Sequence, residues 1–121
     1  MILLDTNVII YLAKGTVDID SIKQDPIAFT SITKIEALGY TQITAAEQQY
    51  LEALLAECEQ LDLTESIIQH AIKLRQRTNI SLGDAIVAAT AIEYNCELYT
   101  ANDKDFSNVE GLRILNPLKK E

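Results

Sequence analysis

Five short apolar runs in the chain each end in polar residues, the pattern typical of buried strands that lead into loops. Pro26 is tolerated because it stands at the start of its run, and Pro117 ends the last run. We therefore predict five strands: ILLD (2–5), PIAFTS (26–31), QLDLT (60–64), CELYT (96–100) and LRILN (112–116).

Helical signals fill the segments between these runs. Gly15 is a natural C-cap, and Thr44 with Glu47 forms the sequence pattern of a capping box. Thr64 and Ser81 are suitable N-caps for two later helices. We predict helices over 7–14, within 16–25 (short), over 32–42, from Thr44 to about Glu59, from Thr64 to about Arg77, and from Ser81 onward.

The segment SLGDAIVAATAIEYN, which begins at Ser81, is apolar nearly all round and predicts a buried helix. Strands that alternate with helices predict an α/β fold whose mainly parallel sheet is covered on both faces. No linker, repeat or low-complexity tract divides the chain, so we expect a single domain over residues 1–121.

The composition is that of an ordinary globular protein, with 48% hydrophobic residues among 121. No apolar stretch reaches the roughly 18 residues of a membrane span, and the N-terminal residues lack a signal-peptide pattern. We expect a cytoplasmic protein with no membrane attachment. Cys58 and Cys96 have no CxxC spacing and are expected to be reduced, and His70 is the single histidine.

Acidic and amide side chains occur in polar segments that would lie near the carboxyl ends of the parallel strands. These residues are Asp5, Glu36, Asp84, Asn102, Asp103 and Asp105. Each also has a local explanation. Asp5, Thr6 and Asn7 are good N-caps, Asp84 is spaced as the acidic partner of Ser81 in a capping box, and the others suit an ordinary surface or loop.

The local explanation is weakest for Asp84, because the helix after it is almost purely apolar. A carboxylate held against the protein beside other acids is costly unless a cation or protons neutralise it. Hard cations such as Mg²⁺ or Mn²⁺ prefer oxygen ligands, and the absence of nearby His or Cys makes zinc a poor fit. Such a site suits metal-assisted hydrolysis of phosphodiesters.

The net charge of −8 argues against a protein that binds nucleic acid through a basic surface. The segment KLRQR (73–77) is typical of a solvated helix face, with RNA contact as the alternative. The basic candidates for RNA contact are Lys34, Lys73, Arg75, Arg77 and Lys104.

Four segments together resemble the PIN domain and, more narrowly, the VapC-type toxins of prokaryotic toxin–antitoxin pairs. They are LLDTNVIIYLAKG, SITKIEALGY, GDAIVAATAIEYNCELYTANDKDF and the closing LRILNP, in the family's order. The resemblance implies a three-layer α/β/α sandwich around a parallel five-stranded sheet. It also implies a Mg²⁺- or Mn²⁺-dependent endoribonuclease that a cognate antitoxin protein restrains.

The family's first three acids fall on Asp5, Glu36 and Asp84. The resemblance implies that Asp5 and Asp84 hold the metal and that Glu36 binds it through water or orients the nucleophile. The family's polar positions beside these acids fall on Thr6, Asn7, Ser31, Thr33 and Thr100.

The sequence departs from the family at the fourth acid, where it has Asn102. An amide oxygen can ligate a metal, but an amide cannot act as a base. Asp105 is therefore expected as a possible fourth catalytic acid, and the adjacent Asp103 is a weaker candidate.

Two other classes of protein remain alternatives. A non-catalytic PIN-fold module that binds RNA or protein would explain Asn102. A receiver-type phosphoacceptor domain fits poorly, because it needs an acidic pair after the first strand. The four isolated glycines exclude a phosphate-cradling loop. An antitoxin groove and a homodimer are both expected, since two-fold dimers are the commonest assembly.

Overall fold

The computed structural model describes residues 1–22 and 25–119, and its strands alternate with helices along the chain. The strands are β1 (Ile2–Leu4), β2 (Ile27–Thr30), β3 (Glu59–Leu61), β4 (Glu97–Tyr99) and β5 (Ile114–Leu115). The α-helices are α1 (Thr6–Lys14), α2 (Ser31–Leu38), α3 (Ala45–Ala56), α4 (Glu65–Arg77) and α5 (Leu82–Glu93). Two 3₁₀ helices, η1 (Ile19–Ser21) and η2 (Asp103–Phe106), complete the order.

The five strands form one sheet in the order β3-β2-β1-β4-β5, and every neighbouring pair is parallel. Successive strands run outward from β1 to β3 on one side, and β4 and β5 lie on the other side of β1. The strand order therefore reverses between β1 and β4. In open α/β sheets, ligands bind in the crevice beyond the carboxyl ends of the strands at such a reversal.

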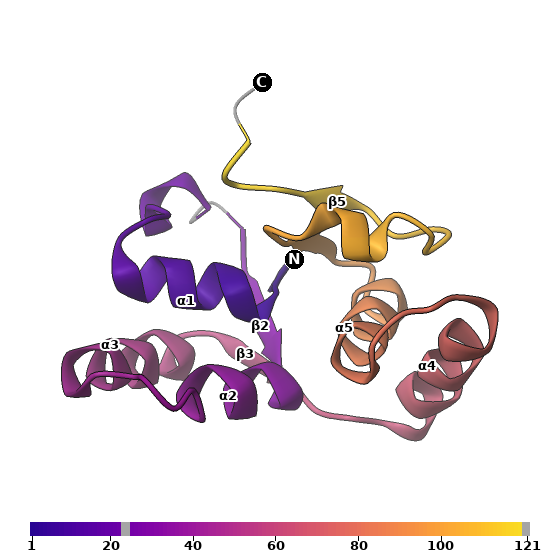
Figure 1. Ribbon diagram of the computed structural model, residues 1–121, viewed down its shortest axis with the longest axis horizontal. Coiled ribbons are helices and arrows are strands. Elements are labelled where there is room, and N and C mark those ends of the chain that lie inside the picture. The colour runs from indigo at the N-terminus through magenta and orange to yellow at the C-terminus, as the bar shows by residue number, and fades with distance from the viewer. Residues whose placement is uncertain (23–24, 120–121) are drawn as a thin grey trace.

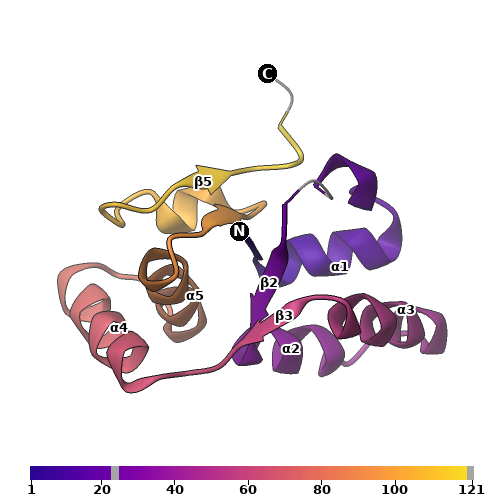
Figure 2. The ribbon, with the colours of Figure 1, turned by 180° about the vertical axis from the view of Figure 1, so that it is seen from behind.

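Alternation of side chains along the strands divides the core in two. Leu3 packs among residues of α4 and α5, whereas its neighbours Ile2 and Leu4 pack among residues of α1 and α3. Figures 1 and 2 show the resulting layers, with α4 and α5 on one side of the strands and α1 and α3 on the other. The expected three-layer α/β/α fold is confirmed, with an entirely parallel sheet.

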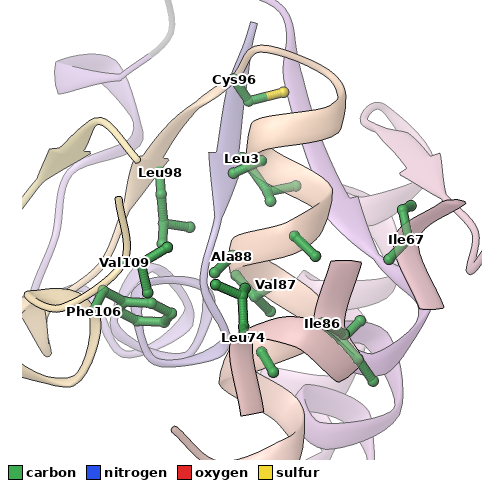
Figure 3. Close-up of a cluster of buried hydrophobic side chains, with 14 of the residues drawn as sticks. Leu3, Ile67, Leu74, Ile86, Val87, Ala88, Cys96, Leu98, Phe106 and Val109 are labelled. Carbon is green, nitrogen blue, oxygen red and sulfur yellow. The ribbon is translucent and has the colours of Figure 1, made fainter. Parts of the chain in front are cut away.

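Helix α5 is the buried helix that its sequence predicts. Its residues 85–91 are all buried, and α4 packs along its outer side. Figure 3 shows Val87 and Ala88 of α5 in one cluster with Leu3 of β1, Leu98 of β4 and Phe106 of η2. Burial of Phe106 fixes the loop that follows β4 against the core.

Polar caps begin the helices where the sequence places them. The side chains of Asp5, Thr44, Thr64 and Ser81 each accept a hydrogen bond from a backbone N–H in the first turn of the following helix. Thr44 and Glu47 form both bonds of the predicted capping box. Gly15 ends α1 at a φ of +78°, a left-handed conformation that favours glycine.

Several boundaries differ from the predicted ones. Helix α2 ends at Leu38 rather than at 42, and the helix predicted within 16–25 is only the turn Ile19–Ser21, with residues 23–24 outside the described chain. The third strand covers 59–61 rather than 60–64, because Thr64 caps α4. The 3₁₀ turn η2 was not predicted, and its N-cap residue Asn102 makes no side-chain capping hydrogen bond.

Cys58 and Cys96 are free thiols, as expected. Within residues 1–22 and 25–119, no helix has the length and apolar character needed to cross a membrane.

Candidate active site

The candidate site lies where the strand order reverses, at the carboxyl ends of β1 and β4. The register pairs Leu4 with Tyr99, so the next residues, Asp5 and Thr100, lie side by side. The Asp5 backbone N–H donates to the Tyr99 carbonyl oxygen at 2.9 Å. The Thr100 hydroxyl donates to Asp5 Oδ2 at 2.8 Å. Two segments that are 95 residues apart are thereby joined.

Asp5 is a buried carboxylate, with only 5% of its surface exposed. Its Oδ1 accepts a hydrogen bond from the Thr6 N–H at 2.8 Å, so it caps α1 as well as facing the site. Burial raises the pKa of Asp5, and the charges of Glu36 and Asp105 raise it further, against the opposing effect of the Thr100 and Thr6 hydrogen bonds. The capping bond of Asp5 is therefore compatible with its predicted role in the site.

Glu36 joins the group from α2. Its Oε1 accepts a hydrogen bond from the Thr6 hydroxyl at 2.7 Å. Its Oε2 lies close to α5 as well, because a Cβ placed on Gly83 would be 3.4 Å from that oxygen. The side chain is exposed, but its carboxylate is held between the first turns of α1 and α5.

A chain of buried threonines supports the Thr6 hydroxyl. Thr6 Oγ1 lies 3.4 Å from Thr33 Oγ1, which in turn lies 3.1 Å from Thr30 Oγ1. Thr30 also caps α2 by accepting the Thr33 N–H at 3.0 Å. Thr30 is not among the predicted site residues, although a threonine between a strand and a helix is a recognisable N-cap signal.

Asp84 lies in the first turn of α5, where Ser81 is the N-cap, and the part of its carboxylate in the site stays a prediction. Its backbone N–H donates to Ser81 Oγ at 3.2 Å, as in a capped helix. Burial raises the pKa of its carboxyl, and the charges of Asp5, Asp105 and Glu36 raise it further, while a hydrogen bond with Ser81 lowers it. Asp84 is thus near enough to all three other acids to feel their charges.

The loop after β4 directs its two aspartates to opposite sides. Asp105 lies near Asp5 and Asp84, since its charge raises the pKa of both. Asp103 instead accepts a salt bridge from Lys119 Nζ at 2.6 Å, and this contact lowers the pKa of Asp103. Asn102 is exposed, and its backbone N–H donates to Thr100 Oγ1 at 3.1 Å. Asp105, and not Asp103, is therefore the acid of this loop that joins the group.

One predicted supporting residue, Ser31, lies apart from the four acids. Ser31 donates to Asp62 Oδ1 at 2.6 Å at the end of β3, so the structure does not bring its hydroxyl to the four acids. Thr33, from the same polar pair, lies in the threonine chain instead. Asn7 is partly buried in the first turn of α1, next to Thr6, and its role stays a prediction.

The donor set fits a hard divalent cation. In the described part of the chain, no three His, Cys, Asp or Glu side chains already converge on one ion position. Mg²⁺, however, is commonly held by one or two carboxylates while it retains several waters. A cation beside Asp5 and Asp84 would also relieve the burial and mutual repulsion that raise the pKa of both groups.

Comparisons with known proteins agree on one family. The family model described as "PIN domain" matches residues 2–112. Ribonuclease VapC of Rickettsia bellii is 27% identical, with 98% of each chain covered. Ribonuclease VapC10 of Mycobacterium tuberculosis is 30% identical, with 93% of this chain and 91% of that protein covered. A toxin–antitoxin complex from Klebsiella pneumoniae contains a chain that matches with a TM-score of 0.83 and 28% identity, over 99% of this chain and 100% of that chain.

Proposed function

Because the chain belongs to the PIN domain family, we propose that it is a divalent-metal-dependent endoribonuclease and the toxin of a toxin–antitoxin pair. The observation that carries the proposal is the placement of four carboxylates near the crevice between β1 and β4. Thr6 bonds to both Asp5 and Glu36, and Asp84 and Asp105 line one cavity. Relatives named as ribonucleases that match nearly the full chain support the reaction class.

Asp5 and Asp84 are the residues that would hold Mg²⁺ or Mn²⁺. When bound, such an ion polarises a phosphodiester and lowers the pKa of a coordinated water. Asp5 is suited to this role because its carboxylate is already held by the Thr6 N–H and the Thr100 hydroxyl. A ligand fixed by such partners does not have to be reoriented when the ion binds.

Glu36 is placed to orient the attacking water. Its Oε1 is held by Thr6, while Oε2 faces the start of α5 beside Gly83. Thr6 therefore fixes one carboxylate oxygen of Glu36, and the other oxygen is left to orient the water. Asp105 is exposed at the edge of the group, where it would supply the fourth acid in place of Asn102.

We also propose a cognate antitoxin and a homodimer as protein partners, and the cytoplasm, where RNA is available, as the location. The antitoxin is supported by the structural match to a chain of a toxin–antitoxin complex. Light scattering on the purified protein tests the homodimer, with a mass near 27 kDa expected from the 13.5 kDa chain.

The deciding experiment measures cleavage of a mixed single-stranded RNA by the antitoxin-free protein with Mg²⁺ or Mn²⁺. We expect cleavage by the wild type, its loss in EDTA, and its loss in Asp84→Asn. Asp103→Asn is the matched control, because Asp103 faces Lys119 rather than the group, and we expect it to cleave normally. Absence of metal binding by the wild type would overturn the catalytic proposal and favour the non-catalytic binding module.

A further inference from the structure

A cavity of about 350 Å³ opens beside Asp84 and Asp105, and Glu36 is not among its lining residues. The end of α4 and the start of α5 form one wall, and the loop 104–109 forms the other. A larger cavity of about 980 Å³ near Lys119 contains Asp103 but none of the four acids. The smaller cavity is therefore the one that continues from the carboxylates.

The lining of this cavity combines the groups that contact a nucleotide. Ile80 and Val109 are buried apolar residues that line part of the cavity. The side chains of Asn79 and Asn108 are exposed amides, which both donate and accept hydrogen bonds at base edges. The volume is within the range of pockets that enclose small ligands.

Lys104 supplies the positive charge in this lining. The described residues form no salt bridge with Lys104, although the protein has 18 acidic residues and 10 basic ones. Its neighbour in the chain is Asp105, so the ammonium group is attached to the same short turn as the fourth acid. A lysine at this place counters the repulsion between an acidic protein and an approaching phosphate.

We propose that this cavity binds a nucleotide of single-stranded RNA next to the phosphodiester that is cut. Lys104 contacts its phosphate, and Asn79 and Asn108 contact its base. The proposal rests on the proposed function for the position of the cut, but the binding itself does not require cleavage. The subsite would make the protein prefer particular bases beside the cleaved bond, because amides discriminate between base edges.

The test measures binding of a fluorescein-labelled single-stranded RNA of mixed sequence by anisotropy, in an Asp5→Asn background that keeps the RNA intact. We expect Lys104→Met to weaken binding by about 3- to 10-fold. It should also reduce the slope of log K against log salt concentration by about 0.7, the value for one phosphate contact on a single strand. Equal thermal unfolding midpoints would show that the variants are folded.

Lys14→Met is the matched control, because it removes the same charge from an exposed position at the end of α1, outside the cavity and not among the basic candidates for RNA contact. We expect it to leave both the affinity and the salt slope unchanged. Equal losses in the two variants would overturn the proposal, since they would show a general effect of charge. Unchanged binding in Lys104→Met would overturn it as well.

Base contact is tested separately through the products of the otherwise wild-type enzyme. We expect the double substitution Asn79→Ala and Asn108→Ala to change which bonds are cut in the mixed RNA. An unchanged product pattern would overturn the base contacts, while the wild-type cleavage would still support the ribonuclease. If the wild type cuts no RNA but Lys104→Met still weakens binding, the proposed function fails and the subsite stands.

Discussion

Asp5 and Asp62 each directly follow a strand of the same parallel sheet, yet their surroundings are opposite. Asp5 follows the central strand β1, is buried, and has a raised pKa because of that burial. Asp62 follows the edge strand β3 and is exposed, and hydrogen bonds from Gln60 and Ser31 lower its pKa. Two aspartates at the same place relative to a strand thus differ in their burial and in the direction of their pKa shift.

The position of the strand within the sheet explains this difference. β1 has neighbours on both sides, so the segments after β4 and β2 both reach Asp5. β3 pairs with β2 alone, and its aspartate meets only polar partners in solvent. A carboxylate becomes a candidate metal ligand here because several elements enclose it, which no single segment can accomplish.

The largest expected effect is the contrast between Asp5→Asn and Asp62→Asn in RNA cleavage. Loss of groups that merely orient metal ligands costs about 10- to 100-fold, so loss of the Asp5 charge should lower kcat/KM by at least about 100-fold. We expect Asp62→Asn to change kcat/KM less than twofold. Comparable losses from the two substitutions would mean that enclosure by several elements does not select the functional aspartate.

Much of the fold could be predicted from local patterns. Apolar runs and caps such as Thr44 and Ser81 act within a few residues, and they located every strand and α-helix to within a few positions. The errors fall where tertiary contacts decide. The strand at 59–61 is displaced from its predicted run at 60–64, because two of its three residues are exposed and pairing with β2 determines its limits.

The candidate site was predicted less completely, because its geometry depends on which face a side chain takes. Asp105 was preferred to Asp103 only through the family resemblance, and it is the turn of η2, with its buried Phe106, that gives the two aspartates different partners. Ser31 and Thr33 were equally plausible supporting residues, but α2 directs them to opposite partners. The proximity of the Glu36 carboxylate to Gly83 brings α2 and α5 together and has no signal in either segment.

The second contrast concerns the hydroxyl partners of the two aspartates and tests stability. Thr100→Val removes the donor to buried Asp5 Oδ2 and leaves the Asn102 N–H without its acceptor. We expect a loss of about 1–3 kcal/mol in the free energy of unfolding, measured by urea denaturation, with recovery in Thr100→Ser. Ser31→Ala removes the donor to exposed Asp62 and should cost less than about 0.5 kcal/mol. Equal losses in the free energy of unfolding from Thr100→Val and Ser31→Ala would contradict the conclusion that Asp5 is more enclosed than Asp62.

The smallest expected effect concerns pH and distinguishes repulsion at the site from ordinary helix capping. The raised pKa of Asp84 means that the fold disfavours its ionised form, so its charge lowers stability at pH 7. In EDTA at pH 7 we therefore expect Asp84→Asn to unfold at a higher temperature than the wild type. This gain should disappear as the pH falls toward the ordinary aspartate value of 3.8, where the wild-type carboxyl is protonated.

In Mg²⁺ we expect the wild type to unfold at a higher temperature than Asp84→Asn, the reverse of the order in EDTA. Binding to the folded wild type alone adds about 2.7 kcal/mol at an ion concentration of 100 times Kd, and Asp84→Asn should lose most of that addition. Glu65→Gln is the control, because Glu65 also lies in the first turn of a helix but is exposed. Its shift in unfolding temperature should be the same with EDTA and with Mg²⁺. If Asp84→Asn were instead less stable than the wild type in EDTA at pH 7, the charge of Asp84 would contribute mainly by stabilising the start of α5, and its repulsion with the other acids would be the smaller effect.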